Sequence, residues 1–172
     1  ITVGGATCTA CSDATTCTAF LCLRNRLNTN GLFSDGCEGC PTFLFADDAA
    51  LTDTGGYNVL TESCVMGNQL NVLSGNTLKI KKDSSVLVEV VMDRQATSSN
   101  PGRHFFVQGT LLVEGITFKG GNEMYGGVVH IMGATASGTF LSCAFIGNVA
   151  NYGSVLYIHT GSATMVGGSC RT

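Results

Sequence analysis

The second half of this chain repeats itself at a fixed sequence offset. Residues 116–132 read ITFKGGNEMYGGVVHIM and residues 143–159 read CAFIGNVANYGSVLYIH, so both fit the pattern F-x-G-x4-Y-G-x-V-x2-I without a gap, at an offset of 143 − 116 = 27. Fainter copies run from about residue 57 to the end; the triplet LVE at 87–89, for example, returns at 112–114. A period of this length indicates a solenoid, in which each repeat buries its apolar side chains against its neighbour.

The repeats are expected to consist of strands rather than helices. Apolar runs such as 110–113 and 128–131 are short, and glycine or asparagine separates them. Helical repeats would need amphipathic runs of about ten residues without glycine, whereas glycine makes up 23 of the 172 residues. We therefore predict an all-β solenoid of parallel, in-register strands with coils of about 25–27 residues.

Equivalent residues of successive coils are expected to lie above one another at a spacing of about 4.8 Å. Tyr125 and Tyr152 occupy equivalent positions, so we expect their rings to stack. Such a stack is either a turn ladder or an aromatic platform for glycans. The predicted core stack consists of Ile116, Phe118, Val128, Ile131, Phe145, Val155 and Ile158.

The two clearest copies also resemble a known family. Their spacing, with Phe118-Lys-Gly-Gly-Asn before Tyr125-Gly-Gly-Val-Val-His-Ile, is similar to the F-x-x-N…G-G-x-I repeats of right-handed parallel β-helix proteins. These include chlamydial polymorphic outer-membrane proteins and other surface adhesins of the pectate-lyase-like superfold. The resemblance covers the repeat region, roughly the last two thirds of the chain, and implies a right-handed parallel β-helix. Ser154 replaces the second glycine of the motif, and Gly121 replaces the asparagine of the first copy.

Nine cysteines, six of them at or before position 40, indicate disulfides and an oxidising compartment. Four of them, in the motifs Cys8-x2-Cys11 and Cys37-x2-Cys40, also fit a tetrahedral zinc site. The cysteines between these motifs and the lack of basic residues nearby favour disulfides. An odd count leaves one cysteine free or bonded to another chain. The disulfide candidates are Cys8, Cys11, Cys17, Cys22, Cys37, Cys40, Cys64, Cys143 and Cys170.

Ile116, Cys143 and Cys170 are equally spaced, one repeat apart, and are expected to form one interior column. Val91 and Cys64 are expected to extend this column. Stacked residues of adjacent coils lie within the Cα separation that a disulfide needs. Cys143 and Cys170 therefore either bond to each other or pack as two buried thiols.

Residues 1–56 lie outside the repeat and are predicted to form a Cys-rich N-terminal cap, with residues 57–172 forming the coils. Ser12-Asp13 can cap a short helix over about 14–27. A cap is expected because an open solenoid end exposes unpaired strand edges. Nothing similar appears at the other end, where either further chain or a neighbouring subunit is expected, and head-to-tail contact would produce a homopolymer.

The sequence contains no assembled catalytic set, and we predict no catalytic residue, no cofactor and no metal site. The candidates for lyase chemistry would be Glu89, Asp93, Arg94, Glu114 and Lys119. Glu89 and Glu114 share a phase in the repeat, so we expect them to form an outward column of acids. The three histidines, at 104, 130 and 159, match no ligand spacing and are expected at the surface or partly packed.

The composition excludes two classes of partner. A net charge of −3 with 12% charged residues argues against nucleic acid, and no apolar run reaches the roughly 18 residues of a membrane span. We therefore predict an extracellular or cell-surface structural protein, a subunit of a filament, appendage or adhesin-like coat. The predicted partners are further copies of the chain, stacked head to tail, and surface glycans. The alternatives are a polysaccharide lyase or glycoside hydrolase of the pectate-lyase-like superfold and a glycan-binding module.

Overall fold

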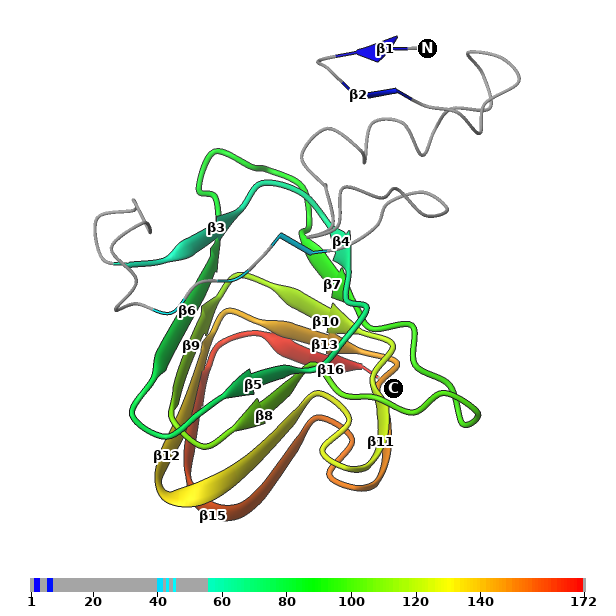
Figure 1. The fold of residues 1–172 in the computed structure, drawn as a ribbon. Helices are drawn as coiled ribbons and strands as arrows, with labels where there is room; N and C mark the ends of the chain where they lie inside the picture. Colours follow the sequence, from blue (N-terminus) through cyan, green and yellow to red (C-terminus); the bar gives the residue numbers. More distant parts are fainter. Residues whose placement is uncertain are drawn as a thin grey trace.

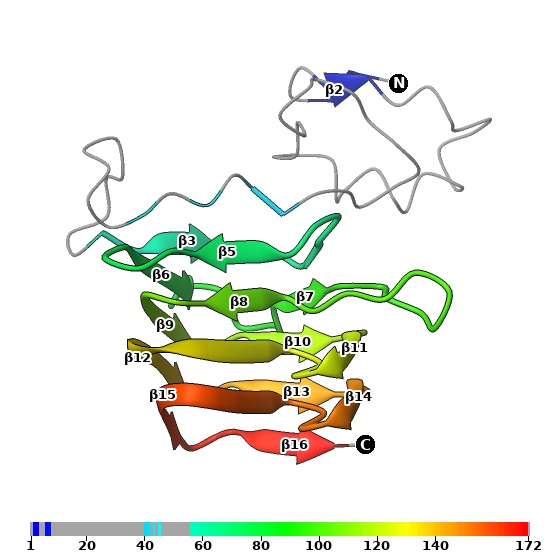
Figure 2. The same ribbon diagram turned by 60° about the horizontal axis from the view of Figure 1, so that its bottom comes forward.

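The computed structural model describes the backbone of residues 2–3 and 6–7, residues 40–41, 43 and 45, and residues 56–171. All regular secondary structure in this part of the chain is β. Residues 56–171 form a β-solenoid of about four turns (Figures 1 and 2). Near the N-terminus, β1 (Thr2–Val3) and β2 (Ala6–Thr7) form a separate antiparallel pair. The predicted all-β parallel β-helix is thus confirmed.

Each coil crosses three faces, and Figure 1 shows the three-sided outline that these faces form. The first face is a five-stranded sheet of β4 (Cys64–Val65), β7 (Val91–Asp93), β10 (Thr117–Lys119), β13 (Ala144–Ile146) and β16 (Ser169–Arg171). The second face contains β5 (Leu70–Val72), β8 (Phe105–Val107) and the first parts of β12 (Val129–Leu141) and β15 (Leu156–Val166). The third face contains β3 (Asn58–Leu60), β6 (Thr77–Lys82), β9 (Thr110–Glu114) and the second parts of β12 and β15.

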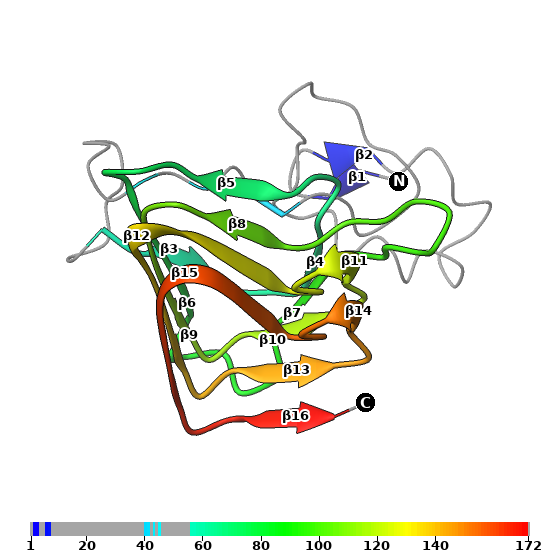
Figure 3. The same cartoon turned by 90° about the horizontal axis from the view of Figure 1, so that it is seen from below.

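A short fourth ladder lies between the first and the second face. It consists of β11 (Asn122–Tyr125) and β14 (Val149–Tyr152), which pair in parallel. β11 and β14 lie at the edge of the solenoid where the chain turns from β10 to β12 and from β13 to β15 (Figure 3). This ladder is the part of the fold that positions the tyrosines predicted to stack.

Strands of successive coils pair in parallel, and their register fixes the length of each coil. On the first face, Cys64 pairs with Met92 and Val91 pairs with Thr117, which are sequence offsets of 92 − 64 = 28 and 117 − 91 = 26. The pair of Thr117 and Ala144 has an offset of 144 − 117 = 27. The pair of Ala144 and Ser169 has an offset of only 169 − 144 = 25. The coil length therefore varies slightly around the predicted value.

The core consists of side chains that alternate along each strand. In β6, Leu78 and Ile80 point inward and are fully buried, while Lys79 and Lys81 point outward. On the first face the inward column is built around the stacked rings of Phe118 and Phe145, whose centroids lie 5.6 Å apart. Cys64 and Met92 continue it above, and Cys170 continues it below.

Most of the predicted core stack is buried. Ile116, Phe118, Val128, Ile131 and Phe145 are closed off from solvent, and Val155 is partly buried. Ile158 pairs with Ile131 as expected but remains 42% exposed, because β15 belongs to the last coil and no described strand covers it.

The glycines of the repeat mark its turns. Gly126 and Gly153 have φ values of 65° and 64°, a left-handed conformation that turns the chain directly after each tyrosine. A Cβ atom at Gly126 would also collide with the carbonyl oxygen of Val129. The Tyr-Gly pair of the repeat is therefore needed to join β11 to β12 and β14 to β15.

The predicted column of Ile116, Cys143 and Cys170 is wrong at its last member. Ile116 and Cys143 do lie one above the other, because Thr117 pairs with Ala144. Cys170, however, pairs with Phe145, because this coil is two residues shorter than the one before. The expected extension by Val91 and Cys64 is wrong as well: Val91 pairs with Thr117 on the outward side, and Cys64 pairs with Met92.

A short segment before the solenoid contacts its first coil. The backbone N–H of Cys40 donates to the carbonyl oxygen of Val65 at 2.8 Å, and Phe45 forms an antiparallel bridge with Leu78. Most of the predicted N-terminal cap, including the helix expected over 14–27, lies outside the described residues.

Candidate functional site: an outer groove and an aromatic corner

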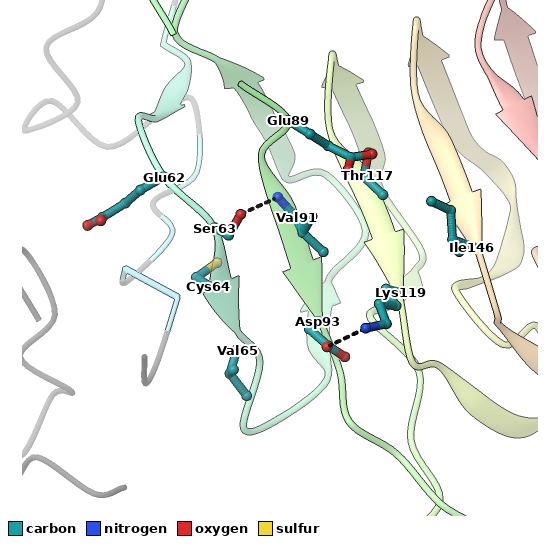
Figure 4. Close-up of a pocket in the computed structure, with 10 residues that line it drawn as sticks. All are labelled: Glu62, Ser63, Cys64, Val65, Glu89, Val91, Asp93, Thr117, Lys119 and Ile146. Carbon is teal, nitrogen blue, oxygen red and sulfur yellow. Dashed lines mark hydrogen bonds and ion pairs between the residues drawn. The ribbon is translucent and has the colours of Figure 1, made fainter. Parts of the chain in front are cut away.

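The outward side of the first face carries a groove of about 690 Å³ (Figure 4). It spans four coils, from β4 to β13, and combines an apolar floor with acidic and basic side chains. The residues that line it are Glu62, Ser63, Cys64, Val65, Glu89, Val91, Asp93, Thr117, Lys119 and Ile146.

The strand register arranges these side chains in rows across the coils. One row contains Asp93 and Lys119, which are paired in register between β7 and β10. Their side chains form an ion pair with 3.7 Å between Oδ2 of Asp93 and Nζ of Lys119. Asp93 also accepts the backbone N–H of Gln95 at 3.0 Å. This carboxylate is therefore already bound on two sides.

In the next row, two side-chain hydroxyl groups form hydrogen bonds. The Ser63 hydroxyl accepts the backbone N–H of Val91 at 2.9 Å, and the Thr117 hydroxyl donates to Oε1 of Glu89 at 2.6 Å. Both contacts join neighbouring coils. They stabilise the floor of the groove and hold Glu89 as a structural acceptor.

The groove gathers three of the five residues considered for lyase chemistry: Glu89, Asp93 and Lys119. Arg94 instead donates to two backbone carbonyls, those of Met66 and Arg103, both at 3.1 Å. It therefore fixes the path of the chain rather than facing the groove.

The expected outward column of Glu89 and Glu114 is wrong. Glu114 ends β9 on the third face, where it pairs with Lys81. Glu89 precedes β7 and bonds to Thr117 on the first face. An equal phase in the sequence does not place two residues in one column here, because connections of different length separate the strands.

The second candidate site lies where the β11–β14 ladder meets the second face. Tyr125 and Tyr152 pair in register and their rings stack, with 5.2 Å between centroids and 14° between planes. This confirms the stack expected from the repeat. Tyr152 is 54% exposed, and Tyr125 is partly buried.

Three further rings join this stack from the second face. Phe106, His130 and Tyr157 are aligned across β8, β12 and β15 and face outward. The ring centroid of Tyr157 lies 5.0 Å from that of Tyr125 and 5.1 Å from that of His130. Phe106 contacts His130 edge to face at 5.2 Å. We call this cluster of Phe106, Tyr125, His130, Tyr152 and Tyr157 the aromatic corner.

A partly buried polar pair supports the aromatic corner. Nη1 of Arg103 donates to Nδ1 of His130 at 2.7 Å, and Nη2 of Arg103 lies 3.4 Å from Oε2 of Glu123. The side chains of Arg103 and Glu123 are only 12% and 24% exposed. Because arginine has no acceptor, Nδ1 of His130 must accept, and the ring proton sits on Nε2.

The same surroundings keep His130 uncharged. Burial lowers the pKa of His130 below its ordinary value of 6.5, the neighbouring Arg103 and His159 lower it further, and Glu123 opposes them in part. The charge of Arg103 is balanced by Glu123. The aromatic corner is therefore close to neutral as a unit at pH 7.

The sequence pointed to two members of the aromatic corner and missed the others. Tyr125 and Tyr152 stand out because the repeat offset relates them. The same offset also relates His130 to Tyr157, and the structure confirms that pair. What the repeat does not show is that the turn at Gly126 brings the two columns into contact.

His104 is wholly buried, so the expectation of a surface or partly packed side chain is wrong for it. Its Nε2 donates to the carbonyl oxygen of Met92 at 3.0 Å, and its ring contacts Phe118 edge to face at 5.3 Å. Burial lowers the pKa of His104 to about 4. Among the described residues, no group of three or more His, Cys, Asp or Glu side chains could hold a metal ion.

The described cysteines divide into one disulfide and two free thiols. Cys40 and Cys64 form a disulfide, which ties the preceding segment to the first coil. Cys143 and Cys170 are not bonded to each other, so the disulfide considered for them is wrong. The Cys143 thiol is buried, contacts the carbonyl oxygen of Leu141 at 3.4 Å, and has a pKa raised by burial. Cys170 is exposed.

These features define the class of the protein as a parallel β-helix with a disulfide-linked first coil. Comparisons of the chain with protein-family models, with curated proteins and with solved structures each found no match. The part of the chain that the structure describes contains no helix able to cross a lipid bilayer.

Proposed function

We propose that the chain is an extracellular structural protein whose solenoids stack end to end through the last coil, as in a filament or an adhesin-like coat. The observation that carries the proposal is the outer edge of β15. No described strand pairs with this edge, and its 11 residues include no Asp, Glu, Lys, Arg or Pro. Natural proteins usually protect an exposed edge with such residues, so an edge without them favours strand pairing.

The surface around this edge is apolar. Ile158 and Val166 are 42% and 56% exposed, and Met165 beside them is also exposed. Below Phe145, the interior of the coil opens into a pocket of about 300 Å³ that Cys170 and Arg171 also line. Such a surface has the character of a solenoid core cut between two coils, and a second copy of the chain would complete it.

The two ends of the solenoid differ, so head-to-tail stacking of successive copies would join two unlike surfaces. At the first coil, the Cys40 segment already bonds to Val65, and Phe45 bridges to Leu78. The edge of the last coil has no such cover within the described residues. The Cys40–Cys64 disulfide supports an oxidising location.

Sedimentation velocity over a wide range of concentrations tests the proposal. The native chain should form a series of oligomers, and the double variant Ile158→Lys/Val166→Lys should sediment as a monomer, because two charges on the edge oppose strand pairing. Leu87→Lys, in the exposed connection before β7, is the matched control and should still associate. A native chain that stays monomeric at every concentration contradicts stacking. A closed dimer that grows no further contradicts the head-to-tail arrangement.

The enzymatic alternative receives less support from the outer groove. Glu89 is hydrogen-bonded to Thr117, and Asp93 is paired with Lys119. Hydrolysis of a glycosidic bond needs one carboxyl group that gives up a proton and one that acts as a base or nucleophile. Acids that serve as structural acceptors between coils suit a scaffold better.

A further inference from the structure

The aromatic corner is the other surface of the molecule that is built for contact. Its rings come from two columns, one on the β11–β14 ladder and one on the second face, and each ring touches at least one other ring. Tyr152 is more than half exposed although it belongs to this packed cluster. The ion pair of Arg103 and Glu123 lies beside it. The rings are thus held in place before any ligand arrives, which lowers the entropy cost of binding.

The tyrosine hydroxyls of the aromatic corner are unused. Within the described residues, the hydroxyls of Tyr125, Tyr152 and Tyr157 make no hydrogen bond. A buried tyrosine hydroxyl usually has a partner in the protein, whereas none of these three side chains is fully buried, so their hydroxyls can bond to a ligand. Three unbonded hydroxyls on one surface suit a ligand that itself carries many hydroxyl groups.

The charges around the aromatic corner limit the class of ligand that it can bind. Arg103 is paired with Glu123, and it donates to a neutral His130. The aromatic corner therefore offers no unbalanced positive charge to a phosphate or a uronate. It offers no unbalanced negative charge to a cationic peptide either. What remains is a neutral molecule with an apolar face and polar edges.

We propose that the aromatic corner binds neutral saccharides, with the apolar C–H face of a pyranose ring against Tyr152 and the sugar hydroxyls against those of Tyr125 and Tyr157. A pyranose ring combines a flat apolar face with a rim of hydroxyls, which matches the amphipathic character of tyrosine. This site is separate in its chemistry from the apolar edge of the last coil, and it adds a ligand-binding role to the structural one.

The tyrosine fluorescence of the chain can be used to measure ligand binding at the aromatic corner. The sequence contains no tryptophan and four tyrosines, and three of the four lie in the aromatic corner. The fourth, Tyr57, lies elsewhere, where the ammonium group of Lys81 is 4.9 Å from its ring centroid. Tyrosine fluorescence of the native chain therefore reports mainly on the proposed site.

The experiment titrates the chain with cellohexaose and maltohexaose, as straight and curved neutral glucans, and with trigalacturonate as an acidic one. At least one neutral glucan should change the tyrosine fluorescence saturably, with a dissociation constant in about the millimolar range. No saturable change with either neutral glucan overturns the proposal. Tighter binding of trigalacturonate than of both neutral glucans overturns the argument from charge.

Variants locate the binding. Tyr152→Ala, at the most exposed ring, should weaken binding by up to about tenfold without unfolding the chain. Tyr157→Phe keeps the ring and removes one hydroxyl, so it should cause a smaller loss. Tyr57→Phe is the control and should bind normally. Unchanged affinity in Tyr152→Ala, measured by calorimetry, overturns the assignment to this corner.

The same titration on Ile158→Lys/Val166→Lys separates this site from end-to-end stacking. If the site is independent, the monomeric variant binds the glucan with native affinity. Loss of binding in that variant would show that the saccharide site needs the stacked assembly, which contradicts a site formed by one chain.

Discussion

A buried histidine sets one part of the pH dependence of stability. His104 donates from Nε2 to the Met92 carbonyl and is enclosed by Phe105 and Phe118. Burial lowers its pKa from 6.5 to about 4, so the unfolded chain takes up a proton more readily than the folded one. The free energy of unfolding is therefore unaffected above about pH 6.5 and falls as the pH decreases from 6.5 towards 4.

Between pH 6.5 and pH 4, we expect His104 to reduce the free energy of unfolding by about 3 kcal/mol, since each pH unit contributes about 1.4 kcal/mol. His104→Gln keeps a donor and removes the titrating ring, so its unfolding free energy should fall less steeply between pH 6.5 and 4. Denaturant unfolding at a series of pH values measures this difference, and the native chain provides the reference for all other groups. Parallel curves for the two proteins would contradict the assignment.

The two free thiols, those of Cys143 and Cys170, differ in accessibility because their surroundings differ. Cys143 is buried and bonded to backbone carbonyls, and its raised pKa keeps it protonated. Cys170 is exposed on β16, next to the edge through which we propose that the solenoids stack. Of these two thiols, Cys170 is therefore the one that a reagent in solution can reach.

At the scale of the element, the turns between strands depend on glycine. Gly126 combines a left-handed φ with a position where a Cβ atom would meet the Val129 carbonyl, whereas Gly147 has a left-handed φ with open space around it. Gly67 has open space and no such φ. Alanine substitutions at these three glycines can therefore distinguish the cost of backbone strain from the cost of a steric collision.

We expect Gly147→Ala to cost about 1–2 kcal/mol of unfolding free energy through backbone strain alone. Gly126→Ala should cost more, because the new methyl group must also displace the chain between β11 and β12. Gly67→Ala should change stability by less than about 0.5 kcal/mol. Denaturant unfolding of the three variants gives the order, and equal costs at 126 and 147 would contradict the turn geometry described here.

The repeat predicted individual strands well because each copy obeys the same local rules. Phe118 and Phe145 occupy the same inward position, and Tyr125 and Tyr152 precede the same left-handed glycine. The sequence could not predict the register of Cys170. The register is fixed by hydrogen bonds between strands, and it shifts by two residues at the irregular part of the β12–β15 pairing, between Ile158 and Ser162. This shift moves every later position of the coil.

The aromatic corner was only half predictable for a related reason. Periodicity relates a residue to its equivalent one coil away, so it finds columns. The contact between Tyr125 and Tyr157 joins two different columns and depends on how sharply the chain turns at Gly126. The burial of His104 likewise depends on rings contributed by other parts of the solenoid, which its own neighbours in the sequence do not reveal.

At the scale of the whole molecule, the Cys40–Cys64 disulfide joins the solenoid to the segment before it. The two cysteines are 24 residues apart, and a loop of this size corresponds to about 3–4 kcal/mol of stabilisation in the chain-entropy account. Coils of a solenoid interact mainly with their neighbours. Removal of the disulfide should therefore affect the first coil most.

In Cys40→Ala/Cys64→Ala, we expect the backbone amides of β3, β4 and β5 to exchange with deuterium faster, while those of β10 and β13 keep most of their protection. Hydrogen exchange followed by mass spectrometry measures both regions in one sample. Cys170→Ala removes an exposed free thiol and should leave the exchange pattern unchanged. Uniform loss of protection along all coils would contradict a molecule stabilised coil by coil.

The match between successive coils has an evolutionary consequence. Phe145 receives from Phe118 the same ring contact that it could offer to a further phenylalanine below, and Tyr152 relates to Tyr125 in the same way. Duplication of one coil's worth of coding sequence would therefore insert a segment that fits both of its new neighbours. Proteins of this design can grow longer by copying, and the newest additions should be the pairs of coils with the most similar sequences.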